Sequence, residues 1–304
     1  MNWFFIALGA PFLWSLVNIT DQYLVSKYAK NKSGLGGLII FIALMGIPVA
    51  LVIGLLVSRV LQIPFLDKIL LIVVGGTTVA WTILYLFALS IEGVSSVALW
   101  FLAIPVFSYL LGYIFLNERL SYQQLIGSLI ILLGLFLVSL DLSGKKQKIK
   151  WKFIMYMLGS CFLFTISGII FKYVTVGNNF WVSSFWQYCG LSVFGILIFL
   201  FIPKYRREFM YMIKNSGGGI AVLTTTSEAL NIGGSILSNF AILLAPVALV
   251  YTINSFQPAI IFLITIFCTF FLPKIAKEDL SKNVILPKMI AIIIIITGSV
   301  VLFM

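Results

Sequence analysis

Ten long apolar runs, separated by short polar or basic breaks, divide the sequence. A helix needs roughly 20 apolar residues to cross the hydrocarbon core of a bilayer, whereas β-barrel strands are about half as long and alternate strictly. The pattern therefore predicts an all-α integral membrane protein, a multi-pass protein of the cell membrane with ten transmembrane helices. The predicted helices lie near residues 3–24, 35–57, 67–90, 94–116, 122–140, 151–173, 181–202, 218–244, 246–271 and 287–303.

The composition supports this prediction. Hydrophobic residues make up 62% of the chain and charged residues only 10%, while a soluble domain carries about 25% charged residues. The 20 Lys and Arg outnumber the 9 Asp and Glu, but they gather in the breaks, as anchors at the membrane surface do. We therefore expect the lipid bilayer and a small-molecule substrate as partners, no nucleic acid, and a monomer or a homodimer.

The sequence lacks histidine and the residue spacings that are typical of many enzymes and metal sites. It contains no histidine, which excludes imidazole bases and histidine metal ligands. Cys161, Cys189 and Cys268 lie in three separate apolar runs, without the paired spacing of a disulfide or zinc framework. We also find no phosphate-binding glycine loop and no nucleophile elbow. The sequence thus predicts no enzyme, no catalytic residue, no metal and no cofactor.

The two halves of the chain align with each other. At an offset of 150, Gly9 meets Gly159 and Trp14 meets Phe164, and at an offset of 153 Pro105 meets Pro258. Because each half has five helices, an odd number, the second half enters the membrane from the opposite side. We therefore expect residues 1–144 and 145–304 to form two inverted five-helix repeats. Secondary transporters commonly have this architecture, because two opposed gates give alternating access to a site at the midplane. The alternative is a ten-helix scaffold or enzyme that arose by duplication.

A run of motifs stands around the fourth and fifth predicted helices. The motifs are Ser96-Val97-Ala98-Leu99, Ala103-Ile104-Pro105-Val106-Phe107, Leu111-Gly112-Tyr113, Leu116-Asn117-Glu118-Arg119-Leu120-Ser121, Gln124, Gly127 and Gly134. Together they resemble the EamA-like family of the drug/metabolite transporter superfamily. The resemblance implies a carrier of small polar metabolites, often an exporter of amino acids or related compounds. It also implies a cavity lined by the first, third, fourth, sixth, eighth and ninth helices, with the fifth and tenth outside it.

Glu228, about ten residues into the eighth run, is the clearest candidate for a functional residue. Charged groups at membrane depth are costly and are functional candidates by default. Asn231, Ser235 and Asn239 follow at spacings of three, four and four, so the four residues share one helical face. Two interpretations remain open: Glu228 carries a proton or binds a substrate cation, or it is a structural carboxylate that is hydrogen-bonded within the bundle.

Other helices offer further candidate substrate-binding residues. Asp21 is a second proton-coupling candidate, although its position near the predicted helix end also fits a carboxylate among the lipid headgroups. The aromatic residues fit either a pocket wall or ordinary packing. The remaining candidates are Trp14 and Asn18 in the first helix, Thr78, Trp81 and Tyr85 in the third, Trp100 in the fourth, and Tyr251 and Asn254 in the ninth.

Four further features concern helix ends and breaks. Pro105 and Pro258 occupy equivalent positions and are candidate hinges, since a proline inside a helix frees a carbonyl; a static kink is the alternative. We interpret Glu118 with Arg119 as a loop-level anchor and helix cap. Lys172 fits a side chain that snorkels to the surface better than a counter-charge. Residues 203–217 fit an interfacial helix or a solvated loop equally well.

The basic residues also predict an orientation. The first, fifth, seventh and ninth connections hold 16 of the 20, and the other four are Arg59, Lys68, Arg119 and Lys172. The positive-inside rule then places both termini outside the cytoplasm. The family resemblance implies the reverse, so the orientation of the termini stays open.

Overall fold

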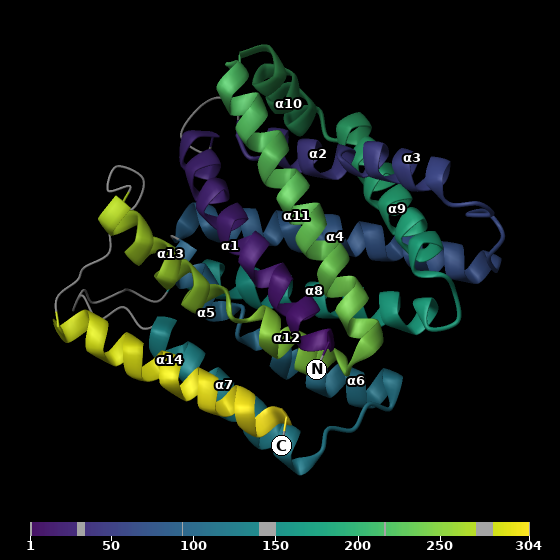
Figure 1. The fold of residues 1–304 in the computed structure, drawn as a ribbon. Coiled ribbons are helices and arrows are strands. Elements are labelled where there is room, and N and C mark those ends of the chain that lie inside the picture. The colour runs from purple at the N-terminus through teal and green to yellow at the C-terminus, as the bar shows by residue number, and fades with distance from the viewer. Residues whose placement is uncertain are drawn as a thin grey trace.

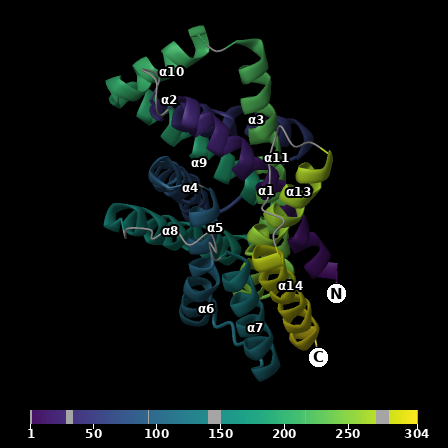
Figure 2. The same cartoon turned by 90° about the vertical axis from the view of Figure 1, so that its left-hand side faces the viewer.

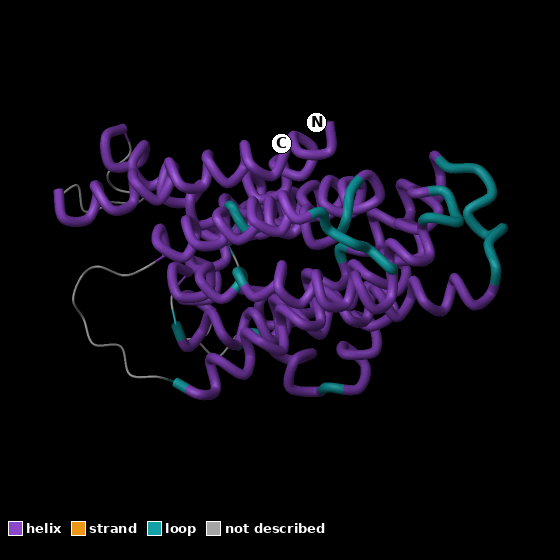
Figure 3. Tube along the Cα trace, turned by 90° about the horizontal axis from the view of Figure 1, so that it is seen from below, coloured by secondary structure: helices purple, strands orange, loops and turns teal. Residues whose placement is uncertain are grey.

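The computed structural model describes residues 2–28, 34–92, 94–139, 150–215, 217–271 and 282–303, and each of its elements is a helix (Figures 1 and 3). In lipid, backbone N–H and C=O groups have no water to bind, and a helix satisfies them within one segment. The helices are α1 (Asn2–Tyr28), α2 (Gly36–Leu44), α3 (Gly46–Leu56), α4 (Phe65–Ile91), α5 (Val94–Trp100), α6 (Ala103–Leu116), α7 (Tyr122–Ser139), α8 (Trp151–Thr175), α9 (Phe180–Phe201), α10 (Pro203–Asn215), α11 (Gly218–Leu244), α12 (Val247–Asn254), α13 (Gln257–Phe271) and α14 (Lys282–Phe303).

Each of the ten predicted runs coincides with one of these helices or with a broken pair of them. The broken pairs are α2 with α3, α5 with α6, and α12 with α13. Within the described residues, seven candidate spans are long and apolar enough to cross a membrane. The apolar parts of α6 and α7 are shorter, and α11 is not among the seven. The multi-pass helical class is therefore confirmed, and the count of ten stays a prediction.

Two corresponding regions of the halves have matching helix boundaries. Helices α4 and α11 both contain 27 residues, and their first and last residues are 153 positions apart. The same offset relates the first residues of α5 and α12. The predicted boundary between the halves, at residues 144 and 145, lies outside the described residues, as do many of the basic residues used to predict the orientation. The inverted arrangement of the halves stays a prediction.

Both candidate hinge prolines follow a break in a helix. Helix α5 ends at Trp100 and α6 begins at Ala103, which puts Pro105 in the first turn of α6. Likewise α12 ends at Asn254 and Pro258 is the second residue of α13. A proline in the first turn sacrifices no helical hydrogen bond, because that N–H has no partner within the helix. The chain therefore breaks just before each proline, and their role as hinges stays a prediction.

The helices that form the walls of the bundle pack in pairs. Helix α1 packs along α11, and α4 packs along both α8 and α9. Helices α7 and α14 pack against each other at one edge of the molecule (Figure 2). Their small residues allow close contact: a Cβ at Gly127 would lie 2.6 Å from the backbone nitrogen of Leu302.

The contact between α4 and α9 is a seam of glycines. A Cβ at Gly75 would collide with the α9 backbone at Gln187 and Leu191. In the other direction, a Cβ at Gly190 would collide with the α4 backbone at Ile72. Glycine at both positions lets the two backbones touch without an intervening side chain, as small residues do in membrane helix pairs.

The connection between α9 and α11 forms a short helix rather than a loop. Helix α10 packs against α2, and its Glu208 and Met212 are buried. The Glu208 carboxylate accepts a hydrogen bond of 2.8 Å from the backbone N–H of Gly36, the first residue of α2. A carboxylate at the positive end of a helix dipole is stabilising. Of the two interpretations left open for residues 203–217, the structure supports the helix.

The glycine seam generates a prediction. Gly75→Ala should lower stability by roughly 3 kcal/mol, because the added methyl group meets backbone that cannot rotate away. Thermal unfolding of the purified protein in detergent measures the change. The matched control is Gly219→Ala on α11, where a Cβ meets nothing within 4 Å. Equal melting temperatures for the two variants would show that α4 and α9 are not in backbone contact.

Candidate functional site

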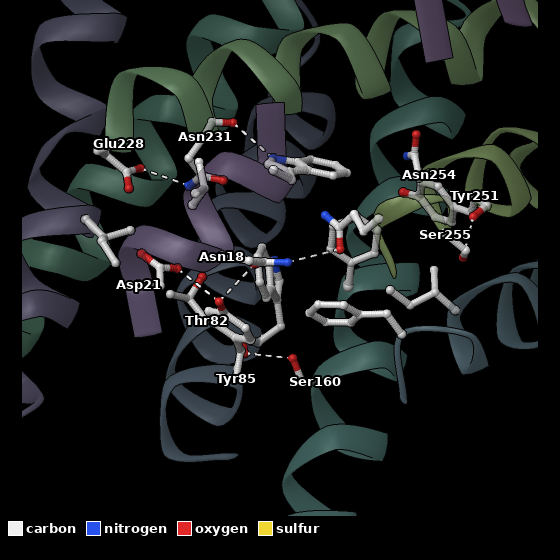
Figure 4. Close-up of a pocket in the computed structure, with 18 residues that line it drawn as sticks. Asn18, Asp21, Thr82, Tyr85, Ser160, Glu228, Asn231, Tyr251, Asn254 and Ser255 are labelled. Atoms are coloured by element: carbon white, nitrogen blue, oxygen red, sulfur yellow. Dashed lines mark hydrogen bonds between the residues drawn. The ribbon is translucent and has the colours of Figure 1, made fainter. Parts of the chain in front are cut away.

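A cavity of about 70 Å³ lies in the centre of the bundle, between helices of both halves (Figure 4). This volume holds several water molecules, since one needs only about 10–15 Å³ of such space. Its walls come from α1, α4, α8, α11 and the breaks between α5 and α6 and between α12 and α13. The residues that line this central cavity are Trp14, Val17, Asn18, Asp21, Ile42, Trp81, Thr82, Tyr85, Phe101, Ile104, Ser160, Phe164, Glu228, Asn231, Tyr251, Asn254, Ser255 and Gln257.

Two smaller chambers of about 30 Å³ each adjoin the central cavity. Trp81 lines all three spaces, so its side chain is a wall common to them. Both chambers reach Gln187 and Ser235; one of them also includes Glu228, and the other includes Asn239. The amide nitrogen of Asn239 donates to the Gln187 side chain at 3.0 Å, which joins α11 to α9.

Asp21 belongs to a polar network between α1 and α4. The Tyr85 hydroxyl lies 3.0 Å from Asp21 Oδ2 and 3.1 Å from Asn18 Oδ1. Asn18 in turn donates to the Gln257 side chain at 3.3 Å. Helix α1 continues seven residues past Asp21, to Tyr28, so this carboxyl lies inside the bundle. Asp21 therefore lines the central cavity, and its depth in the membrane stays a prediction.

Glu228 occupies the same end of the cavity as Asp21 (Figure 4). Its side chain is only 6% exposed, and its Oε1 accepts a hydrogen bond of 3.1 Å from Asn231. The backbone carbonyl of Asn231 accepts a hydrogen bond of 3.3 Å from the Trp14 indole N–H, which links α11 to α1.

Neither carboxyl pairs with a basic residue in the part of the chain that the structure describes. Among the described residues the ion pairs are Lys150–Glu92, Lys172–Glu118 and Lys204–Glu208. Asp21 and Glu228 take part in none of them. Because an ionised carboxylate at membrane depth is costly without a counter-charge, both groups need a proton or a cationic ligand to become neutral.

An aromatic cluster forms the middle of the cavity wall. The Phe164 ring contacts three others, with centroids 6.0 Å from Trp14, 5.3 Å from Trp81 and 5.1 Å from Tyr251. The Trp14 and Trp81 contacts are edge-to-face, the geometry that aromatic quadrupoles favour. The cavity thus combines a carboxyl end with a broad apolar surface.

Ten of the eleven predicted substrate-binding residues line the central cavity or its chambers. The exception is Trp100, the last residue of α5, whose ring packs edge-on against Phe153 at 6.3 Å. Phe101 takes its place in the wall and stacks on Tyr85 at 5.9 Å. The ten are Trp14, Asn18, Thr78, Trp81, Tyr85, Glu228, Asn231, Ser235, Tyr251 and Asn254.

Several lining residues were not predicted, among them Phe101, Ser160, Gln187 and Gln257. They have no distinctive pattern in the sequence. Phe164 is different, because it aligns with the predicted residue Trp14 at the repeat offset of 150. Applying the repeat to the site as well as to the fold would have identified it.

A second charged cluster lies where α6, α8 and α12 meet. Lys172 Nζ is 2.7 Å from Glu118 Oε1 and donates to the Ala245 carbonyl, also at 2.7 Å. Glu118 Oε2 accepts a hydrogen bond of 2.8 Å from the backbone N–H of Val247, the first residue of α12. Lys172 is therefore a counter-charge rather than a snorkelling side chain. Glu118 caps a helix, as predicted, but the helix belongs to the other half of the chain.

The rest of the Leu116–Ser121 motif shapes the end of α6 and the start of α7. Asn117 is left-handed, with φ 53°, and ends α6. Ser121 and Gln124 exchange backbone-to-side-chain hydrogen bonds of 2.9 and 3.2 Å, which is a capping box. The motif is therefore explained by helix termination and by the ion pair.

These features define a multi-pass integral membrane protein whose helices surround a central cavity. Residues 1–140 match the model of the EamA-like transporter family, part of the drug/metabolite transporter superfamily, so the resemblance predicted from the sequence is confirmed. A search of curated proteins found no match. The cavity helices are those that the resemblance implies, with Ile42 of α2 in addition.

The fold itself is shared over the whole chain with a solved structure described only as "Crystal structure of protein". The two superpose with a TM-score of 0.66 at 16% sequence identity, over 99% of this chain and 95% of that chain. At this identity the likeness concerns the fold alone. It covers both halves of the chain, whereas the family model matches residues 1–140.

The Glu118–Lys172 pair generates a prediction. Lys172→Met and Glu118→Gln should each cost roughly 3 kcal/mol, since each leaves a partner unmatched at a site where both side chains are only 13% exposed. The double variant should recover part of the loss. Lys150→Met is the control, because its pair with Glu92 is more exposed and worth less than about 1 kcal/mol. Melting temperatures that match the control would contradict a buried role.

Proposed function

We propose that this protein is a secondary transporter that moves a small polar metabolite across the cell membrane by alternating access. The observation that carries the proposal is Glu228, which lines the central cavity and is buried without a basic partner among the described residues. Burying a carboxyl at membrane depth costs free energy, so such a residue indicates a site for a proton or a ligand. The similarity of residues 1–140 to a transporter family supports the same function.

Proton coupling is the proposed role of Glu228 and Asp21. Both carboxyls lie at one end of the cavity, and each is held by a neutral hydrogen-bond donor, Asn231 or Tyr85. Such donors orient a carboxyl without neutralising its charge. Uptake of a proton or a substrate then changes the charge of the site, and this change is what a coupled carrier uses to bias its conformations.

The breaks before Pro105 and Pro258 are the proposed hinges. Both adjoin the cavity: Ile104 precedes the first proline, and Gln257 precedes the second, and both line the central space. A change in the angle between α5 and α6, or between α12 and α13, would alter the cavity wall directly. This arrangement supports gating at two equivalent positions.

Two other classes of function compete with transport. A membrane-embedded enzyme acting on lipid would need several acids, His or Cys near the headgroups, and the sequence supplies few. A scaffold or receptor predicts no solute flux and tolerance of Glu228→Gln. No observation in the described part of the chain favours either class over transport.

Flux in proteoliposomes tests the proposal. The wild type should move one or more solutes from a pool of labelled amino acids and metabolites, and a pH gradient should change the rate. Glu228→Gln should lower gradient-driven flux roughly tenfold or more, the scale of losing one charged hydrogen bond.

Glu92→Gln is the matched control, because it removes a carboxylate that pairs with Lys150 outside the cavity. It should retain wild-type flux. Flux that survives Glu228→Gln would keep the carrier and make Glu228 structural. Folded wild-type protein that moves nothing in a broad pool would contradict transport of such metabolites.

A further inference from the structure

The charges around the central cavity are of one sign. Its lining includes two acids, Asp21 and Glu228, and none of the described lining residues of the cavity or its chambers is Lys or Arg. Lys172 of α8, a helix that also lines the cavity, pairs with Glu118 and donates to the Ala245 carbonyl. The site can therefore match a positive charge on a ligand and offers no base for a negative one.

The hydrogen-bonding groups show the same imbalance. An ionised carboxylate accepts about four hydrogen bonds, yet Glu228 receives one from Asn231 and Asp21 receives one from Tyr85. At the other end of the cavity (Figure 4), Asn254 is 7% exposed and its Oδ1 is buried without a partner. Buried acceptors without donors are costly. The lining thus has a surplus of acceptors, which a ligand rich in N–H groups would satisfy.

The lining also carries a connected aromatic surface. Trp14, Trp81, Phe164 and Tyr251 all line the cavity, and Phe164 contacts the other three rings. Aromatic faces attract cations and pack well against flat apolar groups. A small hydrated inorganic ion would leave this surface unused, so an organic body fits better than a metal ion.

We propose that the central cavity binds an organic ammonium compound, with its charged nitrogen at Asp21 and Glu228 and its apolar body against the aromatic cluster. A donor group at the far end of the ligand meets Asn254 Oδ1. This ligand class is the substrate class of the proposed transporter. The movement of the ligand rests on that proposed function, but the binding of the ligand does not.

The same chemistry disfavours amino acids and organic acids. An amino acid carries a carboxylate that needs a basic partner or several donors, and the described lining supplies no Lys or Arg for it. An organic anion would in addition be repelled by the two carboxyls. The site should therefore bind an amine more tightly than the amino acid with the same carbon skeleton, and this difference in affinity can be measured.

Four related compounds test whether the cavity prefers an ammonium group: tyramine, its alcohol analogue tyrosol, tyrosine, and 3-(4-hydroxyphenyl)propionate. They share one phenol body and differ in the group that meets the carboxyls. Equilibrium binding to the purified full-length chain, with labelled tyramine and the other three as competitors, should rank tyramine first, roughly tenfold or more ahead of tyrosol. Phenethylamine should bind more weakly than tyramine because it lacks the hydroxyl for Asn254.

The variants connect the preference to the residues. In the double variant Asp21→Asn with Glu228→Gln, tyramine and tyrosol should bind about equally, while Glu92→Gln should keep the wild-type preference. Thermal unfolding of each variant shows that it is folded. Equal binding of tyramine and tyrosol by the wild type, tighter binding of tyrosine, or no binding of either amine would overturn the proposal.

Transport is measured separately, so that the two proposals fail in different ways. Flux of other solutes without amine binding would keep the transporter and remove the ammonium assignment. Amine binding that depends on the two carboxyls, without flux in proteoliposomes, would keep the site and remove the transport function.

Discussion

An ionised side chain that enters a bilayer loses its hydration, so the bundle must supply a base, a proton or a ligand in place of water. This constraint separates the acids of the chain into two groups. Glu118 is matched by Lys172 and by the N–H of Val247, and it holds together helices from both halves. Within the described residues, Asp21 and Glu228 receive hydrogen bonds from neutral donors, Tyr85 and Asn231. The matched acid stabilises the fold, and the other two are the acids on which the proposed site rests.

The rest of the architecture places those two acids at one end of one space. Helix α1 brings Asp21 and α11 brings Glu228, and these helices pack along each other. The indole of Trp14 on α1 holds the Asn231 carbonyl on α11, while Tyr85 of α4 holds Asp21 from the other side. The breaks before Pro105 and Pro258 interrupt the helices where they meet this space. The cavity therefore lies where side-chain hydrogen bonds link α1, α4 and α11 and where the chain breaks between α5 and α6 and between α12 and α13.

Much of this could be predicted from the sequence, because hydrophobic length and polar spacing are local properties. The helical face of Glu228, Asn231 and Ser235 follows from spacing alone, and all three line the cavity or a chamber. Other features depend on contacts between distant segments. Lys172 pairs with Glu118 because the end of α6 lies beside α8. Phe101 lines the cavity in place of Trp100 because α5 ends at Trp100. A pattern read along one helix does not contain such information.

The glycine seam has a mechanical meaning. At Gly75 and Gly190 the backbones of α4 and α9 meet with no side chain between them, and backbone atoms have no rotamers through which one helix could slide past the other. This contact resists sliding of α4 along α9. Trp81, Thr82 and Tyr85 of α4 line the cavity, so we expect a motion that reshapes the cavity to move these residues together with α9. By contrast, the hydrogen bond that links α1 to α11 uses the Trp14 side chain. Side chains can exchange partners, so we expect the more compliant side of the cavity to lie at α1 and α11.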